Sequence, residues 1–435
     1  MSRAAEQRST RGLRETYAAA EIPGAEALHG RIVAAIVDAV AQLEGDVAAT
    51  TLRTGGVELL HTVIEATEIA PVRDHVLDSL RDDLLKVAVA IGRGVLAWEG
   101  EFYVDDYLIL RINFPYEVAR RADPAAENPG VGRLSRDVRD AARARRVVDP
   151  VYDPRGYHRG HPPAAWAHGP HVDSWGGHSK DGVNVWWAIS DVPAGAGMAM
   201  YPAVPSDAVR CDPRTLYVDD GVQLPAPATT ALSAGTLLVF DPEMLHGTHL
   251  NVTAQTRVAL SMRLNGRRPT FDPGCFYARE FWRRASDIDA SVERVLRILR
   301  EDNLAPPCET ARAQLPAAFR PPRVVRGVCA NGSVRIAARE LGRRGRRIVV
   351  EAGDRRIVAM RTETGVVAFD AACPHYGVDL SRGGVQNATL TCPGCALAFD
   401  LRTGRSAAPS LSLTTYRARE RDGTVTVDIA SPASA

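Results

Sequence analysis

The sequence predicts a protein that is mostly β with some α structure: helices first, then a β sandwich or barrel, then a smaller all-β module. From about residue 24 to residue 96, apolar residues recur at three- and four-residue steps, which is helical spacing. From residue 102 the chain changes to short alternating or apolar runs bounded by glycine and proline, which is typical of strands. At 435 residues the chain suits two or three domains, each with its own core.

Individual elements follow from these periods. Helical spacing is clearest in RIVAAIVDAVAQLEG (31–45) and DHVLDSLRDDLLKVAVAIGRGVLAW (74–98). Five later runs predict strands: YLILRINF (107–114), GVNVWWAISDV (182–192), MAMYPAV (198–204), GTLLVFD (235–241) and RVALSMRL (257–264). Alternation along the second run sends one of Trp186 and Trp187 inward and the other outward. SDIDASVERVLRILRED (286–302) returns to helical spacing and predicts a helix.

A connector rich in proline, residues 304–325, predicts a domain boundary near residue 325 because proline cannot continue a helix. The expected domains are therefore residues 1–325 and residues 326–435. Six runs with glycine at the turns predict the all-β module: VRIAARELG (334–342), RRIVVEAG (346–353), RRIVAMRTETG (355–365), VVAFDAACP (366–374), ATLTCP (388–393) and TVTVDIA (424–430).

The charge balance argues against a nucleic acid or a membrane as the main partner. The 53 basic and 52 acidic residues leave a formal charge of +1. No window reaches the roughly 18 consecutive apolar residues of a membrane span, and the first residues lack a signal-like apolar stretch. Seven cysteines, four of them scattered, favour reduced thiols over a disulfide framework. We expect a cytoplasmic protein, with no nucleic acid and no membrane among its partners.

The first metal-ligand pattern is His171-x-Asp173 with the distant His246 and Arg257. Two histidines and a carboxylate leave three positions open on octahedral Fe(II), enough for a bidentate oxoacid and for O2. His171 and Asp173 are two residues apart, so in extended backbone they point to the same face and can chelate one ion. Arg257 follows on a strand that carries Ser261 on the same face, and its planar guanidinium is suited to a carboxylate.

In order and spacing, this pattern, the run around Trp186 and the run HGTHLNVTAQTR (246–257) resemble phytanoyl-CoA dioxygenase-like Fe(II)/2-oxoglutarate oxygenases over about residues 90 to 285. The resemblance implies a double-stranded β-helix (jelly-roll) core. By it, the iron ligands are His171, Asp173 and His246, and the 2-oxoglutarate site is formed by Arg257 with Ser261.

His249 is the competing third ligand. His246 is preferred because it has the family's interval of eleven residues to the arginine. Retention of Asp173 also matters, because related halogenases carry a small residue there to make room for chloride. The resemblance therefore implies hydroxylation, desaturation or oxidation of an alcohol.

Histidines crowd the stretch around the first pattern: His158, His161, His168, His171 and His178. They either line a polar pocket or belong to a solvated loop. The segment 123–170, which is rich in proline, arginine, glycine and histidine, comes immediately before the first motif and predicts a long loop. We expect Trp175 and His178 to contact a small-molecule substrate.

The second pattern is Cys373-x-His375 with Cys392-x-x-Cys395. Rieske centres hold one iron with two thiolates and the other with two imidazoles, from CxH and CxxH loops. Residues 328 to 432 resemble Rieske-type ferredoxins, including the trailing FDLRTG, except that Cys395 stands where the second histidine belongs. Because a thiolate also binds iron, the resemblance implies a 2Fe-2S cluster held by all four residues, with a lowered reduction potential. Zinc at the same ligands and an empty relic of the fold are the alternatives.

Together the patterns predict an Fe(II)/2-oxoglutarate-dependent dioxygenase that oxidises a small polar natural-product intermediate and carries an appended 2Fe-2S electron-transfer domain. One alternative is a Rieske non-haem oxygenase that uses NAD(P)H-derived electrons, although that family places the Rieske module first and has no equivalent of Arg257. A non-catalytic redox or iron sensor is the other, for which an output module is expected. A ferredoxin or reductase is a candidate partner, and an oligomer is left open.

The cluster needs a role of its own, because 2-oxoglutarate already supplies both electrons that the oxygenase requires. The cluster either returns the mononuclear iron to Fe(II) after an uncoupled turnover, or its domain only positions a partner or stabilises the assembly.

Overall fold

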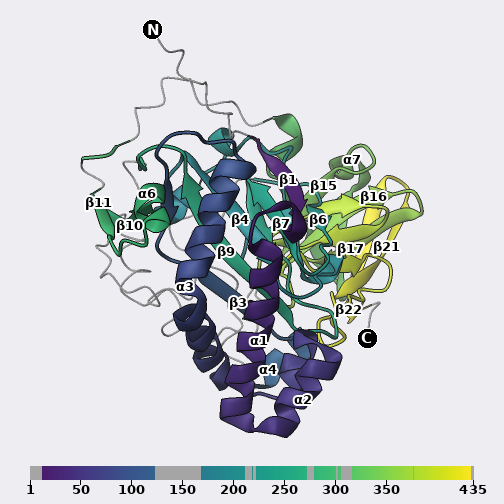
Figure 1. Cartoon of the computed structure of the whole chain (residues 1–435). Helices are drawn as coiled ribbons and strands as arrows, with labels where there is room; N and C mark the ends of the chain where they lie inside the picture. The colour runs from purple at the N-terminus through teal and green to yellow at the C-terminus, as the bar shows by residue number, and fades with distance from the viewer. Residues whose placement is uncertain are drawn as a thin grey trace.

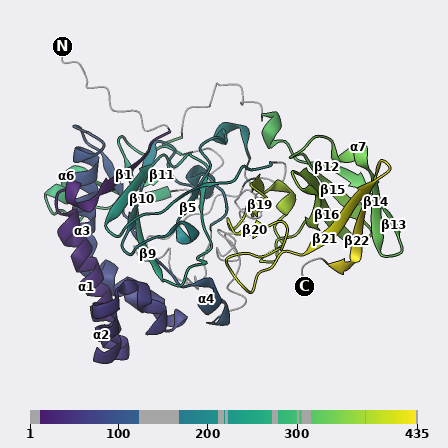
Figure 2. The same cartoon turned by 90° about the vertical axis from the view of Figure 1, so that its right-hand side faces the viewer.

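The computed structural model describes residues 12–122, 168–210, 218, 222–271, 279–299, 302–304, 316–375 and 377–432. Helices, a central pair of sheets and a C-terminal β module follow one another across the molecule (Figures 1 and 2). The prediction of a mostly β protein with helices is confirmed. Among these residues, no helix is both long enough and apolar enough to cross a membrane. Most of the segment 123–170 lies outside the described residues.

Three longer helices form the N-terminal layer, as predicted: α1 (Ala25–Glu44), α2 (Asp46–Gly55) and α3 (Ile69–Gly94). Gly45 ends α1 with a φ of 84°, which costs glycine little, and its N–H donates to the carbonyl oxygen of Ala41. Shorter helical segments are η1 (Ala19–Glu21), η2 (Val57–Thr62), η3 (Ala66–Glu68), α4 (Tyr116–Ala122), η7 (Asp173–Gly176), η8 (Ala194–Ala196), η9 (Ser206–Ala208), α6 (Ala285–Asp289), η10 (Ala317–Phe319), α7 (Ala338–Leu341) and η11 (Leu380–Arg382).

The central sheet has eight strands in the order β1-β7-β4-β9-β2-β10-β11, with β3 also paired to β9. Its strands are β1 (Arg14–Ala18), β2 (Tyr103–Asp105), β3 (Ile109–Asn113), β4 (Gly182–Ala188), β7 (Thr236–Phe240), β9 (Arg257–Asn265), β10 (Arg279–Arg284) and β11 (Leu296–Leu299). All the pairings are antiparallel. Four of the five strand predictions of this region are therefore confirmed in kind, and the fifth, residues 198–204, contains the short strand β5 (Met198–Met200) of a second sheet.

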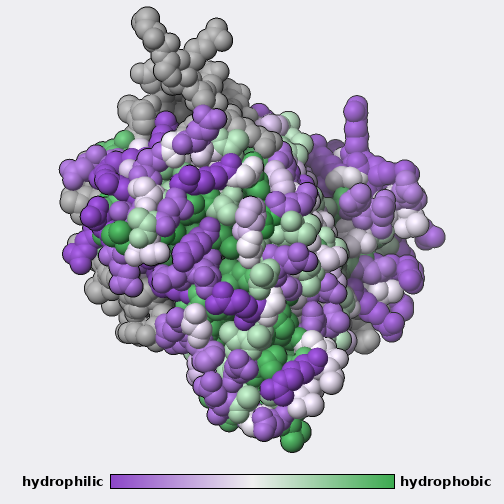
Figure 3. All heavy atoms as spheres, in the orientation of Figure 1, coloured by the Kyte–Doolittle hydropathy of each residue, from purple (hydrophilic) through white to green (hydrophobic). Residues whose placement is uncertain are grey.

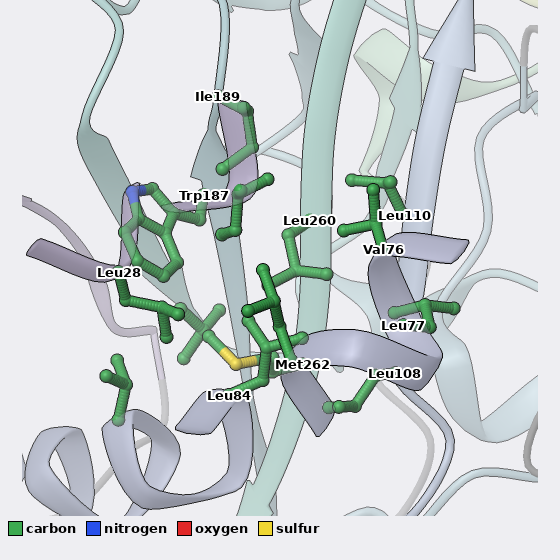
Figure 4. Packing of buried hydrophobic residues seen from close by; sticks show 14 of the residues in the cluster. Leu28, Val76, Leu77, Leu84, Leu108, Leu110, Trp187, Ile189, Leu260 and Met262 are labelled. Carbon is green, nitrogen blue, oxygen red and sulfur yellow. The ribbon is translucent and has the colours of Figure 1, made fainter. Parts of the chain in front are cut away.

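One face of this sheet packs against the helices. Figure 4 shows the contact between Leu28, Val76, Leu77 and Leu84 of the helices and Leu110, Trp187, Leu260 and Met262 of the strands. Burying each such side chain contributes on the order of 1.5–3 kcal/mol. Both Trp186 and Trp187 are buried, because the face opposite the helices is covered as well.

A second, three-stranded sheet covers that opposite face. Its order is β6-β5-β8, with β6 (Ala228–Thr230), β5 (Met198–Met200) and β8 (His246–Thr248). Trp186 and Phe240 of the large sheet share a hydrophobic cluster with Met198 and Met200 of the small one. The polar residues on this face of the large sheet therefore point toward the small sheet, whose strand β8 begins with His246. The double-stranded β-helix connectivity stays a prediction.

The helix predicted over residues 286–302 is largely wrong. The chain forms only the short α6 there and then becomes strand β11, which pairs with β10. Ile298 of β11 packs with Phe271 and Trp282 in a small cluster of its own. Tertiary pairing and burial outweigh the helical spacing here.

The C-terminal module is all β apart from short helical turns, as predicted. Its large sheet runs β12-β15-β16-β17-β21-β22-β14-β13, and its small sheet runs β18-β19-β20. The strands are β12 (Arg323–Arg326), β13 (Val328–Ala330), β14 (Ser333–Ala337), β15 (Arg347–Ala352), β16 (Arg355–Thr362), β17 (Gly365–Asp370), β18 (Gly384–Gln386), β19 (Thr389–Thr391), β20 (Ala398–Asp400), β21 (Thr415–Arg421) and β22 (Thr424–Pro432). The division after residue 325 stays a prediction.

Hydrophilic and apolar residues are interspersed over the helical face of the molecule (Figure 3).

Candidate metal centres

Three of the predicted ligands meet between the two sheets. One ligand atom from each of His171, Asp173 and His246 lies within 4.8 Å of the other two. Asp173 Oδ1 is 3.5 Å from His171 Nε2 and 3.6 Å from His246 Nε2. The backbones of His171 and His246 exchange two hydrogen bonds of 2.9 Å, which holds the remote segments together. Asp173 begins η7, so only His171 and Val172 keep the extended backbone expected of the motif.

Backbone carbonyls fix both imidazoles in the orientation a metal requires. Nδ1 of His171 lies 2.7 Å from the carbonyl oxygen of Gly169, and Nδ1 of His246 lies 2.8 Å from that of Met244. A carbonyl can only accept, so each Nδ1 carries a hydrogen, and each Nε2 is the ring nitrogen that faces Asp173. Burial and the neighbouring His171 lower the pKa of His246 to about 4, which keeps this ring neutral.

Asp173 is held ionised by its surroundings. Its Oδ2 accepts hydrogen bonds from Asn184 Nδ2 at 2.8 Å and from Arg263 Nε at 3.3 Å. Burial opposes ionisation, yet the positive charge of Arg263 holds the pKa of Asp173 well below its usual value. Two imidazoles with a carboxylate, each held by hydrogen bonds, are a donor set that fits a divalent iron ion.

A pocket opens beside this triad. Its walls come from both sheets and from η7: Arg111, His168, His171, Asp173, Gly176, His178, Asn184, Val185, Trp186, Met198, Phe240, His246, Gly247, Thr248, Ser261, Met262 and Arg263. Two predicted residues, His178 and Ser261, therefore line it. Trp175 instead packs against an apolar cluster with Val172 and Tyr201. His158 and His161 lie outside the described residues.

Arg257 lies behind the pocket wall, on the sheet face that looks toward the triad. The residue is 2% exposed, and its guanidinium donates to the carbonyl oxygen of Ala196 at 2.5 Å and to Oδ1 of Asn113. Within the described part of the chain no carboxylate pairs with it, and its Nε has no hydrogen-bond partner. Burial, and then Arg111, lower the pKa of Arg257 to about 9, so the side chain still carries its charge at neutral pH.

Sequence reasoning missed the pocket residues Arg111, Asn184 and Arg263. Arg111 Nε donates to Ser261 Oγ at 3.2 Å, and Arg111 Nη1 is 3.2 Å from His168 Nε2. These residues come from three different strands, and no motif spacing joins them. Strand alternation was the available signal, because Arg263 lies on the same face of its strand as Arg257 and Ser261, and Asn184 is the one polar residue of β4.

His249, the competing third ligand, is not part of the triad. Its Nδ1 lies 2.7 Å from the carbonyl oxygen of Leu250, and its backbone N–H donates to Gly197 at 2.9 Å. The side chain is buried, and burial lowers its pKa. The geometry therefore agrees with the preference for His246.

Three of the four predicted ligands of the second pattern come together, whereas the ring nitrogens of His375 are not part of this group. The sulfurs of Cys373, Cys392 and Cys395 lie within 4.8 Å of one another, and all three residues are buried. A tight turn closes the second loop, with the N–H of Ala396 donating to the carbonyl oxygen of Cys392 at 3.1 Å. The N–H of Gly394 donates to the sulfur of Cys392 at 3.4 Å.

The surroundings of Cys392 favour a thiolate. Burial opposes ionisation, but hydrogen bonds from Cys373, Cys395 and the backbone hold the pKa of Cys392 well below its usual value. Burial lowers the pKa of His375 to about 4, against the opposing influence of Cys392, and leaves a neutral imidazole. Three clustered sulfurs with a nearby neutral imidazole fit an iron-sulfur centre, and the donor types alone also fit zinc.

Comparison with known families identifies the C-terminal module. Residues 333–417 match the Rieske [2Fe-2S] domain family. This match supports a 2Fe-2S cluster at the cysteine site. No curated protein matches the chain significantly.

Solved structures similar to this chain include two ferredoxins and an oxygenase. The ferredoxin of carbazole 1,9a-dioxygenase from Nocardioides aromaticivorans IC177 is 22% identical, with 22% of this chain and 97% of the ferredoxin covered and a TM-score of 0.21. The Sphingomonas yanoikuyae B1 ferredoxin is 24% identical over 20% of this chain and 87% of its own, with a TM-score of 0.19. Apo Dicamba monooxygenase is 27% identical over 22% and 32%, with a TM-score of 0.20.

Proposed function

We propose that this protein is an Fe(II)/2-oxoglutarate-dependent dioxygenase with an appended 2Fe-2S electron-transfer domain. In this proposal, Fe(II) is held by His171, Asp173 and His246, and 2-oxoglutarate is bound with the help of Arg257 and Ser261. The substrate is a small polar molecule in the pocket lined by His178. A double-stranded β-helix core, formed by the two facing sheets, belongs to the same proposal.

One observation carries the proposal: the buried side chain of Arg257 has no carboxylate partner in the described residues and lies over Trp186, which lines the pocket beside the two-histidine, one-carboxylate triad. An isolated buried charge costs several kcal/mol, so such a site is stabilised by an anionic ligand. The distal carboxylate of 2-oxoglutarate supplies that anion, and its oxoacid end suits the open positions on the metal.

Each residue then has a defined task. Asn184 and Arg263 engage one oxygen of Asp173 and leave the other for the metal. Gly169 and Met244 keep the hydrogen of each imidazole on Nδ1. Bound iron supplies the oxygen chemistry, while Trp186, Met198 and Phe240 provide an apolar wall that limits water.

The test is reductase-free oxygen consumption with release of succinate. Protein reconstituted with Fe(II) is screened over candidate metabolites with 2-oxoglutarate, and with 2-oxobutyrate, which lacks the distal carboxylate. We expect turnover with 2-oxoglutarate only, and a large rise in its KM in Arg257→Met. The matched control is Arg294→Met, which removes an arginine whose side chain is 58% exposed. Turnover that ignores 2-oxoglutarate would refute the proposal.

The family match favours a second candidate, a Rieske non-haem oxygenase, because that class also joins an iron-sulfur domain to a two-histidine, one-carboxylate site. Its oxygen consumption would require NAD(P)H and a reductase instead of 2-oxoglutarate. The same assay therefore separates the two candidates.

A further inference from the structure

The cysteine site is enclosed by the rest of its own chain. The exposed fractions are 3% for Cys373, 0% for Cys392, 1% for Cys395 and 7% for His375. An isolated electron-transfer domain has to present its cluster end to a partner. In this protein, other residues of the same chain already cover the end of the C-terminal module that carries the cysteine site.

Residues of the N-terminal domain form the cover. Tyr116 of α4 and Leu250 belong to the same hydrophobic cluster as the three cysteines. The ring of Tyr116 meets the ring of His375 edge to face, with centroids 5.1 Å apart. The backbone N–H of Leu250 donates to the carbonyl oxygen of Cys395 at 3.0 Å. The contact is thus apolar at its centre and hydrogen-bonded to a ligand residue.

Polar contacts fasten the two parts on both sides of this cover. Glu117 Oε1 accepts hydrogen bonds from the backbone N–H of Ser410 at 3.0 Å and from its hydroxyl at 2.7 Å. The buried guanidinium of Arg382 donates to the carbonyl oxygens of Val222 and Val218, each at 3.0 Å. A polar rim around an apolar centre is the usual anatomy of a specific interface.

The segment that contributes Leu250 to the cover also carries His246 of the triad. Leu250 follows His246 by four residues, which spans at most about 14 Å between their Cα atoms even if fully extended. The stretch is fixed along its length: the N–H of Thr248 donates to His168 at 2.8 Å, and the N–H of His249 donates to Gly197 at 2.9 Å. One short, buried stretch and one hydrogen bond therefore connect a triad ligand with the ligand residue Cys395.

We infer that residues 246–250 connect the two metal sites for electron transfer, so that the acceptor for the Rieske-type site is the triad of the same chain. This inference rests on the proposed function for the presence of iron at the triad. An external one-electron donor, of the flavoprotein reductase class, reduces the cluster by one electron. The cluster then gives that electron to a ferric ion at the triad, which becomes ferrous, and no bond or proton is involved.

Freeze-quench electron paramagnetic resonance tests this directly. Anaerobic holoprotein with ferric iron at the triad receives less than one equivalent of dithionite, with neither 2-oxoglutarate nor substrate present. The expected result is that the reduced-cluster signal decays together with the ferric signal, at a rate independent of protein concentration. A reduced cluster that persists beside ferric iron, or a rate proportional to concentration, would overturn the inference.

Two variants at Leu250 distinguish the contribution of its backbone hydrogen bond to Cys395 from that of its side-chain packing. Leu250→Pro removes the N–H that donates to Cys395, whereas Leu250→Ala keeps this N–H and loses the apolar side chain. We expect a greater loss of transfer rate in Leu250→Pro than in Leu250→Ala. Equal rates in the two variants would contradict the role of the hydrogen bond.

A second measurement needs no variant. Mn(II) is bound at the triad of protein with a reduced cluster, and Zn(II) serves as the diamagnetic control. The cluster signal should saturate at higher microwave power with Mn(II) than with Zn(II), because a nearby paramagnetic ion speeds its relaxation. Identical saturation would refute the short connection. Since no assay here contains 2-oxoglutarate, failure of the cosubstrate assignment would leave these results unchanged.

Discussion

The side-chain amide of Asn184 donates a hydrogen bond of 2.8 Å to Oδ2 of Asp173, so that Oδ1 is the oxygen facing the two histidines. A strand residue thereby sets the direction of a carboxylate that belongs to a loop motif.

Asn184→Ala should weaken metal binding without removing a ligand. Loss of a hydrogen bond behind a ligand typically lowers metal affinity by roughly 10- to 100-fold, and we expect an Fe(II) affinity reduced by this factor. Anaerobic Fe(II) titration would measure it, with thermal unfolding of the metal-free protein as the control for folding. Unchanged affinity would mean that Arg263 alone orients Asp173.

Arg257→Met should stabilise the ligand-free protein while it abolishes tight binding of 2-oxoglutarate. The substitution replaces a buried cation, for which the described residues offer no carboxylate, with an apolar side chain of similar length. We expect a gain on the order of 1 kcal/mol in the free energy of unfolding, because the cost of burying the charge exceeds the loss of its hydrogen bonds to Ala196 and Asn113. Urea unfolding with and without 2-oxoglutarate checks both effects, and a destabilised ligand-free variant would contradict the reasoning.

Glu243 should make stability depend on pH. Burial raises its pKa from 4.5 to about 7. Between these values the unfolded chain releases the proton while the folded chain keeps it, so stability falls as pH rises through this window and remains lower above it. Glu243→Gln should remove about 3 kcal/mol of the difference between pH 4.5 and pH 8. Urea unfolding of the parent and the variant at both pH values measures this difference in the free energy of unfolding. An equal dependence of stability on pH in the two proteins would exclude the effect.

Cys395→His should raise the reduction potential of the cluster. A neutral imidazole replaces an anionic thiolate, so the cluster carries less negative charge and accepts an electron more readily. Potentiometric titration followed by electron paramagnetic resonance measures the shift, which we expect to be on the order of 100 mV upward. A colourless parent protein that contains zinc would show that no cluster is present.

Alternation and spacing were enough to predict much of the central architecture. Val185 and Trp187 face the helices while Asn184 and Trp186 face the other sheet, as a period of two requires. The preference for His246 over His249 agrees with the geometry, because only His246 lies at the bridge to His171.

Contacts between remote segments could not be predicted. Arg263 reaches Asp173 across 90 residues, and Leu250 meets Cys395 across 145, and neither pair belongs to a motif. Residues 296–299 were predicted to be helical from their spacing, but they form strand β11 because they pair with β10. The spacing of residues within one segment predicts that segment alone, whereas these two contacts and strand β11 depend on which segments pack together in the fold.

The apolar cluster that joins Tyr116 and Leu250 to the three cysteines makes the two ligand sets hard to separate by truncation. A fragment that ends near residue 325 would expose the apolar side chains of Tyr116 and Leu250 to solvent. The isolated β module would expose its cysteine thiols to solvent and to oxidation by O2. Transplanting this module onto another oxygenase would therefore require a matching apolar recess, and a backbone donor where Leu250 stands here.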